Sequence, residues 1–142
     1  MATQLEVAGE LVEGFEMFDD WEERYGLLID LGKKIPPLDD AEKTEDHRIH
    51  GCQSKVWVVA GEAEKDGQDV IIFRADSDSA IVKGLVALLY KVYNERTPKE
   101  VLSFDINHLL DQLELGQHLS MNRRNGLAGI VTRIRELALK HV

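Results

Sequence analysis

The spacing of apolar residues divides the first part of the chain into two helices. Residues 4–18 carry apolar side chains three or four positions apart, which predicts an amphipathic helix. A second helix begins at Asp20, an N-cap residue followed three positions later by Glu23. We expect it to end before Gly32, because glycine is favoured just past a helix end. Its apolar face comprises Trp21, Tyr25, Leu28 and Leu31.

Two strand-like runs follow a polar and irregular stretch at residues 38–51. Residues 55–61 and 68–75 are rich in apolar and β-branched side chains, and the pair Asp66-Gly67 between them is a strong turn signal. These features predict an antiparallel β-hairpin.

The next apolar segment predicts a central buried helix. Residues 80–94 are apolar almost all round, and residues 76–79 supply several N-cap candidates. Gly84 within this helix costs roughly 1 kcal/mol relative to alanine. We expect the hairpin to approach the helix closely at Gly84, which would explain why glycine is present there.

Three further helices are predicted in the last third of the chain. Thr97, Pro98 and Glu100 match a capped helix start. A short helix is expected near residues 109–115, ending at Gly116, and a last amphipathic helix from about Ser120. Runs of helices around a small antiparallel sheet predict an α+β fold.

Length and composition favour one globular domain over residues 1–142. The chain is 44% hydrophobic, enough for a core, and carries a net charge of −9 from 17 basic and 26 acidic residues. Nucleic acid is therefore an unfavourable partner, since its binding requires a basic surface. No apolar stretch approaches the roughly 20 residues that span a bilayer, and residues 1–6 do not resemble a secretory signal. We expect a cytoplasmic protein without a membrane partner.

The single cysteine, Cys52, is the main candidate for chemistry. It lies where a polar loop meets a predicted strand, and nearby cationic groups raise the thiolate fraction of such a thiol. The alternative is a buried structural cysteine, since free cysteines are often buried, and the local sequence leaves both open. One cysteine excludes an intramolecular disulfide and a four-thiolate cluster, and no recognised zinc-ligand spacing is present. Its titratable or basic neighbours are His47, Arg48, His50 and Lys55.

Arg123 and Arg124 stand in the first turn of the last predicted helix. Positive charge there opposes the helix macrodipole, by typically about 0.3–1 kcal/mol per exposed group. Such a pair can hold a carboxylate or another anion. An ordinary solvated charge or surface ion pair is the simpler interpretation of these residues taken alone.

Four motifs, in order along the chain, together resemble the SufE family of sulfur-acceptor proteins. The resemblance covers roughly residues 13–140 and leaves residues 1–12 as an N-terminal extension. Four ordered motifs in one short chain are far more specific than any one of them. The motifs are DWEERY at 20–25, GCQSKVW at 51–57, ADSDSAIVKG at 75–84 and LSMNRRNGL at 119–127.

The resemblance implies an α+β fold similar to that of the cluster scaffold IscU, and a function that depends on partners. Members of the family accept sulfur from the persulfide of a cysteine desulfurase that uses pyridoxal phosphate (PLP), and they stimulate that enzyme. They pass the sulfur toward an iron–sulfur cluster scaffold or another acceptor. The implied donor here is a SufS-like or CsdA-like desulfurase, and the chain itself would need no cofactor or metal.

The same resemblance assigns roles to individual residues. Cys52 matches the sulfur acceptor, and loop or partner support falls to Gly51, His50, Gln53 and Arg123. Two positions depart from the family pattern, because His50 and Met121 stand where proline is common. Each departure removes a φ restraint, and His50 adds a titratable group beside the thiol.

Three other functions compete with the sulfur acceptor. A non-covalent activator would stimulate a desulfurase without using the thiol of Cys52. A cysteine hydrolase would need a Cys–His pair, and the chain has five histidines but no protease signature around Cys52. A cluster scaffold would need more ligands than one cysteine per chain supplies, which makes it the weakest competitor.

Overall fold

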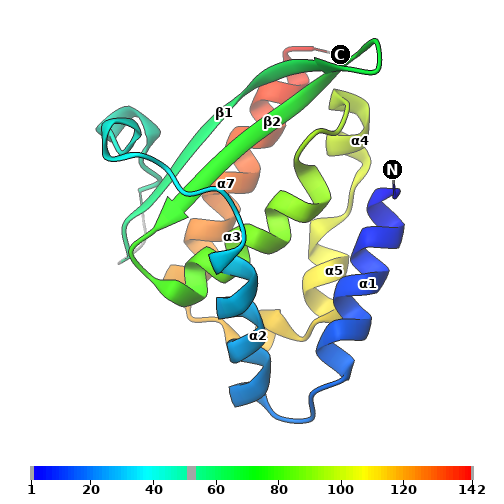
Figure 1. The fold of residues 1–142 in the computed structure, drawn as a ribbon, viewed down its shortest axis with the longest axis vertical. Coiled ribbons are helices and arrows are strands. Elements are labelled where there is room, and N and C mark those ends of the chain that lie inside the picture. The colour runs from blue at the N-terminus through cyan, green and yellow to red at the C-terminus, as the bar shows by residue number, and fades with distance from the viewer. Residues whose placement is uncertain (1, 51–53, 142) are drawn as a thin grey trace.

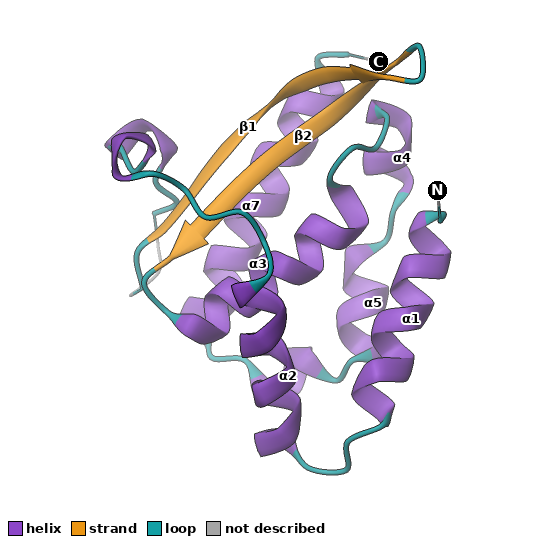
Figure 2. Cartoon of the chain, viewed as in Figure 1, coloured by secondary structure: helices purple, strands orange, loops and turns teal. Residues whose placement is uncertain are grey.

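The computed structural model describes residues 2–50 and 54–141, apart from the side chain of Asn122. Within these residues, helices pack against one face of an antiparallel hairpin, which confirms the predicted α+β fold (Figures 1 and 2). The strands are β1 (Val56–Lys65) and β2 (Gln68–Ser77). The helices are α1 (Gln4–Glu16), α2 (Trp21–Lys33), α3 (Ala80–Tyr93), α4 (Pro98–Ser103), α5 (Ile106–Gln112), α6 (Leu115–His118) and α7 (Met121–Leu139).

Helix α3 forms the centre of the molecule, as its apolar sequence predicts. It contacts α1, α2, α7 and β2, and Figure 1 shows it crossing the middle of the fold beneath the hairpin. Val86 and Val92 on this helix are fully buried. Burial of each such side chain stabilises the fold by roughly 1.5–3 kcal/mol, so α3 organises the hydrophobic core of the described residues.

The predicted hairpin is confirmed, and its strands extend beyond the apolar runs. Strand β1 continues to Lys65 and β2 to Ser77, with Ala60 opposite Phe73 in the register. The turn residues Asp66 and Gly67 have φ angles of 52° and 78°. Two successive positive φ angles are typical of a type I′ turn, whose twist matches that of the paired strands.

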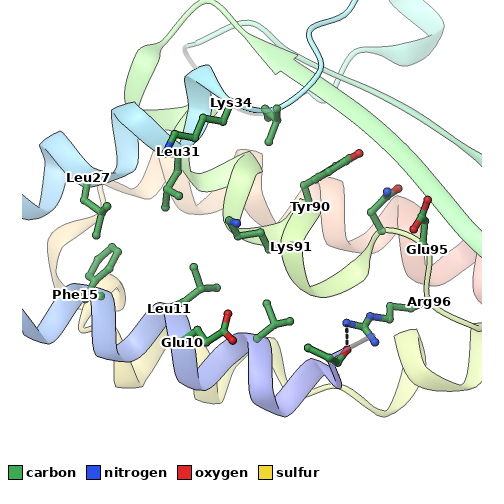
Figure 3. A pocket seen from close by; sticks show the side chains of 15 residues that line it. Glu10, Leu11, Phe15, Leu27, Leu31, Lys34, Tyr90, Lys91, Glu95 and Arg96 are labelled. Carbon is green, nitrogen blue, oxygen red and sulfur yellow. Dashed lines mark hydrogen bonds between the residues drawn. The ribbon is translucent and has the colours of Figure 1, made fainter.

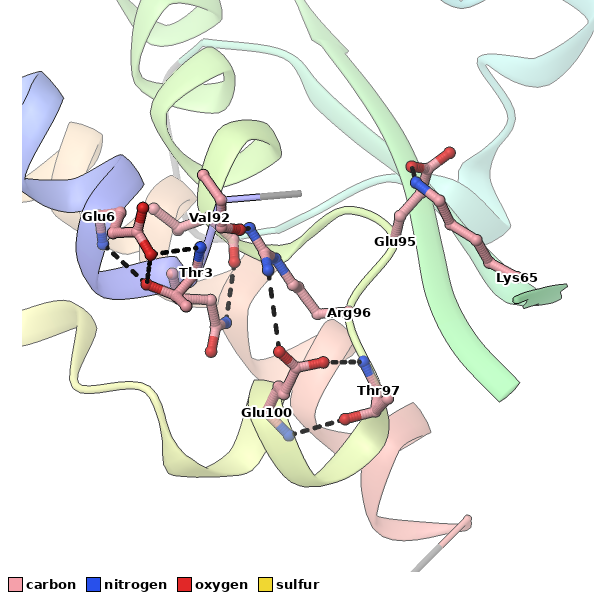
Figure 4. Close-up of polar contacts among 10 residues, drawn as sticks. Thr3, Glu6, Lys65, Val92, Glu95, Arg96, Thr97 and Glu100 are labelled. Atoms are coloured by element: carbon pink, nitrogen blue, oxygen red, sulfur yellow. Dashed lines mark hydrogen bonds and ion pairs between the residues drawn. The ribbon is translucent and has the colours of Figure 1, made fainter. Parts of the chain in front are cut away.

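Side-chain caps begin the helices where the sequence predicts them. Thr97 and Glu100 form a complete capping box at the start of α4, with distances of 3.0 and 3.2 Å between each backbone nitrogen and the other residue's side-chain oxygen (Figure 4). Ser120 accepts a hydrogen bond from the Arg123 backbone N–H at the start of α7, at 3.3 Å. These local bonds satisfy amide groups that the helix itself leaves unpaired.

The expected end of α2 and the expected neighbour of Gly84 were both wrong. Gly32 lies inside α2, which continues to Lys33, and Gly84 faces α2 and not the hairpin. A Cβ placed on Gly84 would lie 2.3 Å from the Leu28 carbonyl oxygen, and one on Gly32 would lie 2.8 Å from the Gly84 nitrogen. The two glycines therefore allow the backbones of α2 and α3 to touch, and this long-range reason leaves no local signal.

The predicted helix at residues 109–115 is divided in two. Helix α5 ends at Gln112, Glu114 adopts a left-handed conformation with φ of 59°, and Gly116 lies inside α6. Leu113 and Leu115 are both fully buried. Residues two apart in a continuous helix point in nearly opposite directions, so the break at Glu114 allows both leucines to reach the core.

Two short 3₁₀ turns, η1 (Asp40–Glu42) and η2 (Glu45–His47), lie in the polar stretch before β1. At the other end of the chain, His141 approaches the hairpin, with its Nε2 2.8 Å from Glu62 Oε1.

Among the described residues, no helix combines the length and apolar character needed to cross a membrane.

Candidate functional site

The strongest candidate from the sequence, Cys52, lies outside the described residues, together with Gly51 and Gln53. The structure describes the chain on either side of them. We call residues 46–49 the upstream flank and residues 54–56 the downstream flank. Their contacts show how the rest of the fold holds the two ends of the cysteine segment.

The upstream flank is paired with the beginning of β1. The Ile49 backbone N–H donates to the Val56 carbonyl oxygen at 2.8 Å, and Arg48 forms an antiparallel bridge with Trp57. Ile49 is 5% exposed, so its side chain anchors the flank in the core. The cysteine segment therefore leaves and re-enters the fold at adjacent points.

The downstream flank is tied to the residues that lead into α3. The Lys55 backbone N–H donates to Asp78 Oδ1 at 3.0 Å, and the Asp78 N–H donates to the Lys55 carbonyl oxygen at 3.2 Å. This reciprocal pair satisfies both backbone groups of Lys55. It also joins the flank to the short segment between β2 and α3.

Helix α7 also holds the upstream flank. Arg133 donates from Nη1 to the Asp46 carbonyl oxygen and from Nη2 to the Arg48 carbonyl oxygen, both at 3.0 Å. One turn earlier, Gly129 leaves room for Ile49, because a Cβ at Gly129 would lie 2.3 Å from Ile49 Cγ2. Sequence reasoning missed both residues of α7, since their role depends on chain segments about eighty residues away.

A buried carboxylate stabilises the corner beneath these flanks. Asp76 is 5% exposed and accepts hydrogen bonds from the backbone N–H groups of Leu38 and Ser77, at 3.2 and 2.9 Å. Lys43 and Lys83 approach its two oxygens at 3.7 and 3.5 Å. A buried charge is tolerated when it is paired and hydrogen-bonded in this way. The sequence offers Asp76 only as one of several caps, so its structural role was missed.

The turns before the upstream flank carry a second ion pair. Arg74 on β2 donates to both carboxylate oxygens of Glu42, and this guanidinium holds the pKa of Glu42 below its ordinary value. His47 Nδ1 lies 2.7 Å from the Glu42 carbonyl oxygen. A carbonyl oxygen only accepts, so Nδ1 of His47 is the donor in this contact.

Two other predicted site residues are described. His50 is exposed, and its Nε2 lies 2.9 Å from Oε1 of the exposed Glu45. Arg123 lies half-buried in the first turn of α7, and the exposed Arg124 lines a groove of about 430 Å³ between α5 and α7. His118, a distant candidate, stacks on Trp21 with ring centroids 3.8 Å apart. Within the described ranges, no three His, Cys, Asp or Glu side chains are grouped to hold a metal.

A larger groove, of about 610 Å³, lies between α1, α2 and α3 (Figure 3). Its floor is apolar and includes Leu11, Phe15 and Leu31, while Lys91 and Arg96 lie along it. None of the predicted site residues that the structure describes lines this groove. The residues around the cysteine segment are therefore a separate feature of the fold.

Comparisons with known proteins bear on the family and the fold of this chain. The family model described as "SufE: Fe-S metabolism associated domain" matches residues 9–138. Among solved structures, the chain is similar to a hypothetical protein from Thermus thermophilus, determined in solution, with a TM-score of 0.69 and 22% sequence identity over 94% of each chain. At that identity the likeness supports the fold alone. The family model covers most of the chain and links it to Fe–S metabolism, so the protein belongs to the SufE family.

Proposed function

We propose that this protein is a sulfur acceptor, which takes sulfur onto Cys52 from the persulfide of a PLP-dependent cysteine desulfurase. Membership of the SufE family is the observation that carries the proposal. The chain has one cysteine, and the flanks of the segment that contains it are held by β1, by Asp78 just before α3, and by α7. In this proposal Cys52 presents its thiol to a partner protein from between two anchored flanks.

The proposed step is a nucleophilic displacement between sulfur atoms. The Cys52 thiolate attacks the outer sulfur of the donor persulfide, a new S–S bond forms on Cys52, and the donor's S–S bond breaks. The donor cysteine leaves as a thiolate, so the exchange needs no external oxidant or reductant. It resembles thiol–disulfide exchange, whose rate depends on the thiolate fraction and on access to the sulfur.

Two features of this chain favour formation and retention of a persulfide on Cys52. Without a second cysteine, no neighbouring thiol of the same chain can reduce the persulfide and release its sulfur. Arg48, four positions before Cys52, has a buried Nε–H that finds no hydrogen-bond partner among the described residues. We propose Arg48 as a cation near the thiol of Cys52, where it would raise the thiolate fraction.

The product persulfide would then pass its sulfur to a downstream acceptor, such as an iron–sulfur cluster scaffold. Arg123 and His50 are proposed to support the loop or to contact the desulfurase. His50→Pro, which restores the residue common in the family, is expected to retain sulfur acceptance. Complete loss of transfer in that variant would assign His50 a chemical role instead.

Desulfurase stimulation tests the proposal and separates it from non-covalent activation. A purified SufS-like or CsdA-like desulfurase is assayed for alanine formation from cysteine, with wild-type protein and with Cys52→Ser. The sulfur-acceptor function predicts stimulation by the wild type and loss of most of it with the variant. Equal stimulation by both proteins would refute the acceptor role and favour an allosteric activator.

A further inference from the structure

One arginine of α7 makes a two-point contact with the upstream flank. The Nη1 and Nη2 groups of Arg133 each donate to a backbone carbonyl, of Asp46 and of Arg48, at 3.0 Å. The planar guanidinium presents its donors in a rigid fork, so the two bonds set both the position and the direction of the chain between the carbonyls. A single flexible ammonium cannot reproduce this geometry.

Gly129 adds a third contact with the upstream flank, on the same face of α7. It precedes Arg133 by four residues, so the two positions lie one above the other on the helix. Ile49 occupies the space over Gly129, where an added Cβ would approach Ile49 Cγ2 to 2.3 Å. The buried Ile49 also donates its backbone N–H to Val56. Consequently α7 determines the path of residues 46–49, which end three positions before Cys52.

We propose that Arg133 is a positioning residue for Cys52, which acts by holding residues 46–49 on α7, together with the space left at Gly129. This inference rests on the proposed sulfur transfer. A displacement between sulfur atoms requires the attacking sulfur to approach along the donor's S–S bond, and small errors of placement in such reactions cost large factors in rate. An anchored flank limits the positions from which Cys52 can approach the donor.

Arg135 provides a matched control on the same helix. Like Arg133 it is half-buried and donates a hydrogen bond to a backbone carbonyl, from Nη1 to Leu102 at 3.2 Å. Its partner belongs to α4, away from the upstream flank. Arg133→Ala and Arg135→Ala therefore remove the same charge from α7 but differ in whether the upstream flank loses its contacts.

The experiment uses full-length wild type, Arg133→Ala, Arg133→Lys and Arg135→Ala, with urea unfolding to confirm that each is folded. Amide hydrogen exchange reports on residues 46–49 without any partner. Single-turnover transfer from a persulfide-loaded desulfurase, measured across protein concentrations, separates the transfer rate at saturation from the half-saturating concentration. Alkylation of Cys52 by iodoacetamide across pH reports on thiol reactivity without demanding a docked geometry.

We expect Arg133→Ala to raise exchange at residues 46–49 by at least about tenfold and to lower the saturating transfer rate by about tenfold. The half-saturating concentration and the pH profile of alkylation should stay close to wild type. The exchange and transfer rates of Arg133→Lys should lie between those of the wild type and those of Arg133→Ala. Arg135→Ala should behave as wild type in all three assays. Gly129→Ala, which displaces Ile49 without changing charge, should act like Arg133→Ala.

Three results with Arg133→Ala would overturn the inference. Unchanged exchange at residues 46–49 in Arg133→Ala would show that the arginine does not hold them. Raised exchange with an unchanged transfer rate would show that holding them does not position Cys52. A shifted alkylation profile would indicate an effect on the thiol itself. Failure of the wild type to accept sulfur would refute the proposed function, and the positioning role with it, whatever the exchange data show about the anchor.

Discussion

The contact between α2 and α3 makes a specific prediction for Gly84→Ala. The added methyl group would lie 2.3 Å from the Leu28 carbonyl oxygen, 2.6 Å from the carbonyl carbon and 2.9 Å from Leu28 Cβ. Two of these atoms belong to the backbone of α2, so no side-chain rotation relieves the overlap. The two helices must move apart, which opens the core around the fully buried Leu28.

The expected magnitude follows from two opposing effects. Alanine in a helix is favoured over glycine by about 1 kcal/mol, while overpacking a core typically costs about 1–3 kcal/mol and more where backbone must move. We expect a net loss of about 2 kcal/mol in the free energy of unfolding. For a domain of this size that loss lowers Tm by about 6 °C.

Gly26→Ala is the matched control for this measurement. Gly26 lies in α2 at an exposed position where no atom would come within 4 Å of an added Cβ. Only the helix preference remains, so the free energy of unfolding should rise by roughly 0.5–1 kcal/mol. Urea unfolding followed by circular dichroism measures both variants. If Gly84→Ala were as stable as Gly26→Ala, the close contact between the helices would be refuted.

Three further substitutions test other parts of the fold. The hydroxyl of Tyr93 is buried without a hydrogen-bond partner among the described residues, and burial raises the pKa of Tyr93 to about 12. Below the ordinary pKa of about 10, Tyr93 stays protonated in the folded and the unfolded protein. As pH rises toward 12, the unfolded protein loses this proton first, so stability falls. Tyr93→Phe should therefore flatten the alkaline loss of stability without destabilising the protein at neutral pH, and a large loss at neutral pH in urea unfolding would contradict this. Asp76→Asn should destabilise by about 2 kcal/mol, because it removes the buried carboxylate that Lys43 and Lys83 both approach, and an unchanged urea midpoint would count against this ion pair. Thr97→Ala should cost about 1 kcal/mol through loss of the α4 cap, and thermal unfolding with no change in Tm would show that the capping box is dispensable.

Features that depend on a few neighbouring residues could be predicted from the sequence. The turn at Asp66-Gly67 and the cap at Thr97 were both confirmed, because the conformations involved depend on residue types within four positions. The central position of α3 was also confirmed, since its apolar residues surround the helix axis.

Features that depend on distant segments could not be predicted. Gly32 was interpreted as a helix end because glycine is common there, whereas its contact partner, Gly84, is more than fifty residues away. The break at Glu114 reflects the need to bury both Leu113 and Leu115, which no local rule for helix ends contains.

Predictions about the candidate site divide in the same way, into those that local motifs support and those that depend on distant contacts. The motif around Cys52 and the family assignment came from the sequence, and the family is confirmed. The residues that hold the ends of the cysteine segment were not foreseen, because Arg133 is separated from its partners Arg48 and Asp46 by 85 and 87 positions. The roles of Cys52, Gly51, His50, Gln53 and Arg123 remain predictions.

The central claim is that Cys52 itself carries the sulfur. Mass spectrometry of the intact protein and of its peptides, after incubation with a cysteine desulfurase and cysteine, measures this most directly. The account predicts that the wild type gains the mass of one or more sulfur atoms, located on the peptide with Cys52, and that a reductant removes them. A protein that stimulates the desulfurase yet never gains sulfur at Cys52 would contradict it.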